Sequence, residues 1–333
     1  MRKLAFVLFV AAAACGKSPS GGGGTNPDAA NMGSNGGSNT GGGSLAFEIK
    51  SSDIDLPAGA EFTKCYYFHT SNTAQVAINE WVSDMTPGSH HLIMFLNTAG
   101  TSQPADGTID ENCSFGNSAT NIPSWTYAAA VPHADEVMPS DDGAGKPLAQ
   151  NIPPNTPGFV QMHYLNATDM DETVHVDVKA YKLADGATYT PTAPYITYTK
   201  NFTVPPGAST ITGSCDVPTG TKFWQLSSHT HKQGTDVQIS DGTSMVYSST
   251  DSNGNWEHPN VHQWMTNPFY TFSGKLNWAC SYQNSGTGNI VEGQSAATNE
   301  MCMATGYLFP ATAPVFRVQV YSGTTSQGCF ALN

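Results

Sequence analysis

The stretch TVHVDVKAYKL, residues 173–183, alternates apolar and polar side chains from one position to the next. Successive residues of a strand point to opposite faces, so each kind of side chain gathers on one face. One face carries Val174, Val176 and Val178, and the other carries His175, Asp177 and Lys179. This pattern predicts a strand of an antiparallel sheet that buries one face and exposes the other.

Similar runs rich in β-branched and aromatic residues recur from residue 46 onward, without convincing helical periodicity. The clearest are HLIMFL at 91–96, GFVQMHYL at 158–165 and VFRVQVYS at 315–322. Turn formers such as TPG and VPPGAS separate them. The alternation fades after Lys182 in a stretch rich in Pro and Thr. We therefore predict an all-β protein of two tandem antiparallel, jelly-roll-like β-sandwich domains, at residues 46–188 and 189–333.

The first residues indicate export. Residues 1–14 combine a basic start with an apolar run that is too short to span a bilayer, as in a signal peptide. The AAAC ending resembles a bacterial lipoprotein signal, which makes Cys15 the lipidated first residue of the mature protein. The alternative is an ordinary signal peptide with an incidental cysteine. Residues 15–45 are dominated by Gly, Ser and Asn, which predicts a disordered tether.

The charge content argues against nucleic acid as a partner. Only 12% of the residues are charged, against about 25% in an average soluble protein, and the formal net charge is −13. Binding to a phosphate backbone needs clustered Lys and Arg, which this composition lacks.

The cysteines suggest disulfides in an oxidising compartment. The chain has seven, and setting Cys15 aside leaves an even number, enough for three bridges. The first predicted domain holds Cys65 and Cys113, and the second holds Cys215, Cys280, Cys302 and Cys329. If disulfides stay within domains, Cys65 must pair with Cys113, whereas the pairing in the second domain stays open.

Two short histidine motifs have the composition of metal sites. His229 and His231, in LSSHTHKQ, are two positions apart and share one face of a strand, so both imidazoles can reach one ion. His90 and His91, in TPGSHHLIMF, are adjacent and point to opposite faces of a regular strand. A shared metal therefore requires a β-bulge or a distorted start of that strand, which the Pro-Gly turn just upstream permits.

Further candidates stand alone. His163, in GFVQMHYL, is either a ligand or a partly buried, hydrogen-bonded histidine. Met301 precedes Cys302, so on a strand their side chains diverge, and the thioether can face a cleft while Cys302 enters a disulfide in the core. The remaining histidines carry no local pattern and are interpreted as surface residues: His69, His133, His175, His258 and His262. Of these, His133 and His262 are the ones to reconsider if they reach a cleft.

Taken together, the His-His pair, the Gln-x-His-Tyr, the His-Thr-His and the Glu-Met-Cys resemble the copper type II, ascorbate-dependent monooxygenases. That family includes peptidylglycine α-hydroxylating monooxygenase and dopamine β-monooxygenase. The four motifs occur in the same order, with similar spacing, over residues 46–333. The resemblance implies two copper ions, one per β-sandwich, that face each other across a solvent-filled cleft.

The resemblance also implies which residues bind and which cysteines pair. His90, His91 and His163 would hold the electron-transfer copper, and His229, His231 and Met301 would hold the oxygen-activating copper. The implied disulfides of the second domain are Cys215–Cys329 and Cys280–Cys302. Neutral imidazoles suit copper in both oxidation states, and a thioether favours Cu(I).

The sequence departs from the peptide-amidating member of the family where that enzyme anchors the substrate carboxylate. Its arginine, asparagine and tyrosine are replaced here by Ser227, Met303 and Thr305, although Tyr307 lies nearby. Because no cationic clamp remains at these positions, we do not expect a peptide carboxylate as substrate.

We therefore expect an exported copper monooxygenase that hydroxylates a C–H bond of a small molecule with O2 and an ascorbate-like reductant. It would be a monomeric cell-envelope lipoprotein, in the outer membrane or periplasm or at the cell surface, held to the membrane by its lipid. One alternative is a copper-binding or copper-buffering lipoprotein with the same ligands. Another alternative is a β-sandwich recognition module whose metal ligands are vestigial. The presence of all six ligands argues against this alternative.

Overall fold

The computed structural model describes residues 43–97, 102–111, 124–250, 252–256, 258–293, 295 and 298–332. All of them belong to one compact unit. The predicted signal peptide, Cys15, nearly all of the tether and Cys113 lie outside these residues, and so does the expected pair Cys65–Cys113. Within the described residues there is no helix long and apolar enough to cross a membrane.

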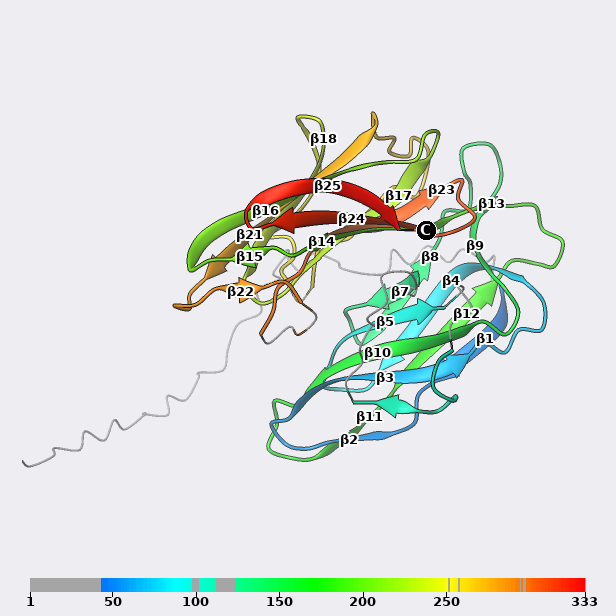
Figure 1. Ribbon diagram of the computed structural model, residues 1–333. Helices are drawn as coiled ribbons and strands as arrows, with labels where there is room; N and C mark the ends of the chain where they lie inside the picture. The colour runs from blue at the N-terminus through cyan, green and yellow to red at the C-terminus, as the bar shows by residue number, and fades with distance from the viewer. Residues whose placement is uncertain are drawn as a thin grey trace, which may run out of the picture. The chain divides into compact units, whose positions relative to one another are not determined.

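The chain is all-β, as the alternation predicts, and its first half forms two large sheets (Figure 1). One sheet has the order β1 (Ser44–Lys50), β12 (Val176–Lys182), β4 (Val76–Met85), β9 (Leu148–Ile152) and β13 (Thr190–Pro191), with β8 (His133–Val137) also paired to β4. The other has the order β6 (Ile109–Asp110), β3 (Glu61–His69), β10 (Pro157–Leu165), β5 (Ser89–Leu96) and β7 (Ser124–Ala129). A short ribbon joins β2 (Ile54–Leu56) and β11 (Glu172–Val174).

The second half repeats this organisation with a second pair of large sheets. One has the order β20 (His262–Gln263), β17 (Lys222–Thr230), β23 (Cys302–Phe309), β14 (Ala193–Lys200), β24 (Val315–Ser322) and β25 (Thr325–Leu332). The other has the order β16 (Gly207–Asp216), β21 (Lys275–Asn284), β18 (Gly234–Asp241) and β19 (Ser244–Thr250). A short ribbon joins β15 (Thr203–Val204) and β22 (Ile290–Val291). The predicted β-sandwich architecture is confirmed.

Most strand pairs are antiparallel, but β9 with β13 and β14 with β24 are parallel. The chain passes from the sheets of the first half to those of the second between β13 and β14, at Thr192. That position lies in the Pro- and Thr-rich stretch where the alternation fades. The domain limits at residues 188 and 189 stay a prediction.

Each pair of sheets encloses its own apolar core. The first is built around Trp81, Tyr127 and Val178, and it extends to Trp224 and Tyr307 of the second half. The second is a separate cluster built around Phe223, Leu276, Trp278, Cys280 and Cys302. Burial of this much apolar surface is the main favourable term in folding.

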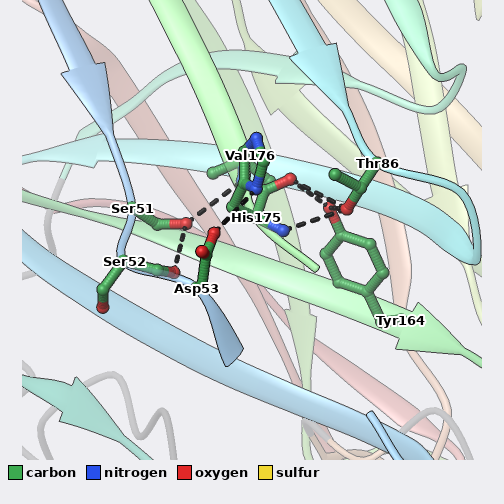
Figure 2. Close-up of polar contacts among 7 residues, drawn as sticks. All are labelled: Ser51, Ser52, Asp53, Thr86, Tyr164, His175 and Val176. Carbon is green, nitrogen blue, oxygen red and sulfur yellow. Dashed lines mark hydrogen bonds and ion pairs between the residues drawn. The ribbon is translucent and has the colours of Figure 1, made fainter. Parts of the chain in front are cut away.

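The stretch TVHVDVKAYKL behaves as predicted, with one interruption. Val174, Val176 and Val178 are fully buried, but the strand breaks between β11 and β12 at His175. There the backbone N–H of His175 donates to Thr86 Oγ1, and its carbonyl accepts from the Tyr164 hydroxyl at 2.7 Å (Figure 2). The His175 ring pairs with Asp53 at 3.0 Å on the polar face.

Candidate metal centre

The adjacent histidines of the first motif converge because β5 carries a bulge. In the pairing of β10 with β5, His163 lies opposite His91, whereas Tyr164 lies opposite Ser89, so His90 is the extra residue. The start of this strand therefore has the distortion that a metal shared by the two histidines would require. It brings Nδ1 of His90 and Nδ1 of His91 to 3.3 Å, which a regular strand does not allow.

Hydrogen bonds fix the backbone on either side of this bulge, in the turn before β5 and in the partner strand β10. Gly88, in the turn before β5, has a φ of +82°, a conformation that a residue with a Cβ rarely adopts, and its carbonyl accepts from the Leu165 N–H at 2.8 Å. The Tyr164 hydroxyl and Thr86 both bind the carbonyl of His175 (Figure 2). The turn before His90 is thereby bonded to β10, and Tyr164, which follows His163, is bonded to the break at His175.

His90, His91 and His163 form the first histidine group, whose potential ligand atoms all lie within 4.8 Å of one another. Nε2 of His163 is 2.6 Å from Oε1 of Glu61 on β3, and the His163 ring is almost fully buried. This contact fixes the ring orientation and leaves Nδ1 as the nitrogen that a metal would bind, the usual arrangement of a ligating imidazole supported by a carboxylate. The sequence-based reasoning missed Glu61.

His229 and His231 share one face at the end of β17, as predicted, with ring centroids 5.2 Å apart. Nδ1 of His231 lies 3.0 Å from the carbonyl oxygen of Asn299, so Nδ1 carries the proton and Nε2 is the nitrogen with a lone pair for a metal. The buried Glu300 accepts the backbone N–H groups of His231 and Gln233 at 2.9 and 2.7 Å. These bonds tie the chain after β17 to the residue that precedes Met301.

Met301 and Cys302 diverge as predicted. Met301 is 8% exposed and lines a cavity, whereas Cys302 is fully buried in the core of the second half. Cys302 is bonded to Cys280, and a second disulfide joins Cys215 to Cys329. Both are the pairs that the resemblance implies. His229, His231 and Met301 are called the second group below.

Both groups line a single cavity of about 570 Å³. The aromatic and aliphatic part of its wall comes from both halves of the chain and includes Ile93, Phe95, Trp125, Ile196 and Phe316. The rings of His91 and His229, one from each group, have centroids 6.4 Å apart. The arrangement can therefore hold two metal ions close together beside a largely apolar space.

Burial sets the charge state of the imidazoles. It is the main cause that lowers the pKa of His229 to about 3, with the nearby His231 adding to the effect. Burial likewise lowers the pKa of His231 to about 4 and holds the pKa of His91 well below its usual value. All three rings are neutral at neutral pH, which is the protonation state that binds metals.

Polar residues without a local motif also reach the cavity. Glu136 lies beside Gln225, whose Nε2 donates to Oε2 of Glu136 at 3.4 Å. Lys200, an exposed cation that the sequence-based reasoning did not consider, also lines the wall, with its ammonium 5.3 Å from the centre of the Tyr198 ring. Ser227, Met303 and Thr305 line it as well.

The histidines interpreted as surface residues divide into two sets. His69, His133 and His175 pair with Asp106, Asp84 and Asp53, and the His262 ring meets the Trp264 ring edge to face. In the described part of the chain, none of these four lines the cavity. His258 is different: it is exposed, yet its ring stacks near His90 with a centroid distance of 5.7 Å, as does Trp256 at 5.6 Å. A Trp-x-His sequence does not have the spacing of a metal site, so no local sequence pattern predicts that His258 lies near His90.

Comparisons with known proteins give no family for this chain. No known sequence family matches it, and no curated protein does. Among solved structures, PNGase F, a glycosylasparaginase from Flavobacterium meningosepticum, is 8% identical over 86% of this chain and 100% of its own, with a TM-score of 0.35. A cowpea mosaic virus particle protein is 8% identical over 85% of this chain and 95% of its own, with a TM-score of 0.34. The major capsid protein P2 of bacteriophage PM2 is 9% identical over 78% of this chain and 97% of its own, with a TM-score of 0.28. Likenesses this weak do not bear on the site.

Proposed function

We propose that this protein is an exported copper-dependent monooxygenase that hydroxylates a C–H bond of a small organic substrate. The proposal joins the resemblance in sequence to one structural observation. Two groups of potential ligands, one of three imidazoles and one of two imidazoles and a thioether, line the same apolar cavity. An enzyme that moves electrons between two copper ions and oxidises a bound molecule needs this combination of sites and space.

The donor atoms favour copper over other metals. Neutral imidazole binds copper in both oxidation states, and a thioether adds a soft ligand that favours Cu(I). Structural and catalytic zinc sites use histidine, cysteine and carboxylate ligands. A thioether at Met301, beside His229 and His231, is therefore more easily explained by copper than by zinc.

In the proposed reaction, His90, His91 and His163 hold the electron-transfer copper, and His229, His231 and Met301 hold the oxygen-activating copper. Copper, when bound, supplies the one-electron transfers and the activation of O2. One oxygen atom enters the C–H bond, and the other leaves as water with two protons and two electrons. The electrons come one at a time from ascorbate or a similar donor.

The chain itself supplies orientation and exclusion of water. Glu61 fixes the ring of His163, and the carbonyl of Asn299 fixes the ring of His231. Trp125, Ile196 and Phe316 give the cavity an apolar wall on which a small substrate can pack. Ser227 and Thr305 offer hydroxyl groups rather than a guanidinium, so the substrate we propose is small and is not anchored at these positions through a peptide carboxylate.

The proposed location follows from the signal-like start of the sequence, and a lipid on Cys15 would hold the protein to the cell envelope. The disulfides Cys215–Cys329 and Cys280–Cys302 are compatible with an oxidising compartment. A copper-buffering lipoprotein is the second candidate. It is favoured by Met303, a further thioether on the cavity wall that can complete the coordination of a stored ion.

Oxygen consumption by the copper-loaded protein tests the proposal. With ascorbate, a screen of small aromatic and aliphatic compounds should give a hydroxylated product that carries ¹⁸O from labelled O2. His163→Ala and Met301→Ile should each nearly abolish coupled turnover, while Met301→Ile retains Cu(II). His69→Ala, which changes a histidine outside the cavity, is the matched control and should remain active. If the rate of oxygen uptake never exceeded the rate with free copper and ascorbate, whatever compound was added, the copper-buffering function would be favoured.

A further inference from the structure

The strand that follows Met301 brings a second methionine to the same ion-binding region. In the pairing of β17 with β23, Met303 is the direct partner of His229, and Cys302 is the partner of Thr230. Directly opposite residues of an antiparallel pair have Cβ atoms about 4.5–5.5 Å apart and point to the same face. His229 and Met303 therefore project side by side from the sheet.

The same alternation separates Met303 from the core of the second half. Its neighbours Cys302 and Ala304 belong to that core, whereas Met301 and Met303 form a different buried cluster with Ile196. Met303 is 5% exposed and lines the cavity together with His229, His231 and Met301. Two imidazoles and two thioethers thus face one space from the ends of two adjacent strands.

From this juxtaposition we propose that Met303 is a fourth ligand, which makes the second group a two-histidine, two-methionine site selective for Cu(I). The proposal rests on the proposed assignment of copper to His229, His231 and Met301, and it holds whether that copper activates oxygen or is stored. Two thioethers are softer than one and favour the reduced ion, whereas Cu(II) is held mainly by the imidazoles. A methionine side chain is flexible enough to approach the ion or withdraw from it.

The competing explanation is that Met303 only packs against Ile196 as part of an apolar wall. The two explanations differ in the number of sulfur atoms bound to copper, which X-ray absorption measures directly. The experiment uses a His91→Ala, His163→Ala background, so that the first histidine group no longer binds and the spectrum reports on the second group. The ion is Cu(I) alone, added without oxygen.

In that background we expect two sulfur neighbours per Cu(I), and one after Met303→Leu. Competition with a Cu(I) chelator should show Cu(I) affinity lowered on the order of tenfold by Met303→Leu, the lower end of the usual cost of removing a supporting group near a metal. Cu(II) affinity should change little. Met85→Leu, at a methionine that is 6% exposed and does not line the cavity, is the control and should change neither quantity.

A single sulfur neighbour with and without Met303, together with equal Cu(I) affinity, would overturn the role of Met303 and leave the three-ligand site intact. Failure of the proposed copper assignment looks different. In that case the background protein shows no sulfur neighbour, and His229→Ala does not reduce its copper content.

Discussion

The rings of His91 and His229 meet edge to face, with centroids 6.4 Å apart and planes at 81°. They come from different sheets, β5 and β17, and from different ligand groups. The sequence resemblance implies groups that face each other across a solvent-filled cleft, whereas these two rings are near neighbours. Each ring also lies in the low-dielectric surroundings that lower its pKa. An ion bound by one ligand group would therefore lie close to the other ligand group.

This proximity predicts two copper ions of unequal affinity per chain. The second ion binds more weakly than the first because like charges repel more strongly where water is excluded. Metal analysis after dialysis should give two coppers, and titration calorimetry should resolve two steps. His163→Ala should remove one ion and leave the other. A stoichiometry of one that His163→Ala does not change would contradict the assignment of two sites.

Glu61 should control the first histidine group without binding the metal. Its carboxylate holds Nε2 of His163 at 2.6 Å, and loss of such a supporting partner usually lowers metal affinity about 10- to 100-fold. We expect Glu61→Ala to weaken copper at this group by that factor and to leave the second group unchanged. Glu111→Ala, which removes an exposed partner of Lys64, is the control. Equal affinities for both variants would show that Glu61 does not position His163.

The disulfide Cys280–Cys302 should stabilise both the fold and the second group. Removal of a native disulfide typically costs about 2–5 kcal/mol of unfolding free energy. Because Cys302 directly follows Met301, the double variant Cys280→Ala, Cys302→Ala should also bind copper more weakly at the second group. Denaturant unfolding and Cu(I) competition measure the two effects.

The other disulfide provides the matched control for this prediction. Cys215→Ala, Cys329→Ala removes a bridge between residues that do not line the cavity. It should lower stability and leave copper affinity unchanged. If both double variants lost copper equally, general destabilisation rather than the position of Met301 would explain the effect.

Local patterns predict much of this protein. Strict alternation places Val174, Val176 and Val178 in the core, because strand geometry alone decides which face each residue takes. The bulge at His90 is one that local reasoning allows without requiring: the Pro-Gly turn before β5 permits it, and two adjacent histidines need it if they share an ion. The opposite directions of Met301 and Cys302 follow from the same rule.

What the sequence does not predict depends on contacts between distant segments. Glu61 and His163 are 102 positions apart, and no spacing rule connects them. The stacking of His258 near His90 joins a loop of the second half to a strand of the first. The parallel pairing of β14 with β24 has no local signature either, because the direction of a neighbouring strand leaves the alternation unchanged.

The carboxyl group of Glu136 should make the stability of the folded protein depend on pH. Burial raises its pKa to about 7, against a smaller opposing effect of the hydrogen bond from Gln225. Oε1 is out of contact with solvent and has no hydrogen-bond partner among the described residues. The folded protein therefore keeps this proton at pH values where the unfolded chain, with a usual glutamate pKa, has lost it.

The sign follows from linkage. Below about pH 4 the group is protonated in both states and costs nothing. As the pH rises from about 4.5 to about 7, the unfolded chain ionises this carboxyl while the folded protein keeps its proton, so stability falls, and above about 7 the loss is constant. At about 1.4 kcal/mol per pKa unit, the loss reaches up to about 3 kcal/mol above neutral pH. Glu136→Gln keeps the size of the side chain but cannot ionise, so it should match the parent near pH 4.5 and exceed its stability at pH 8. Urea midpoints across this range measure the difference, with Asp135→Asn, at the exposed neighbour on β8, as control. Parallel pH profiles for the parent and Glu136→Gln would show that this carboxyl group is not buried in the folded protein.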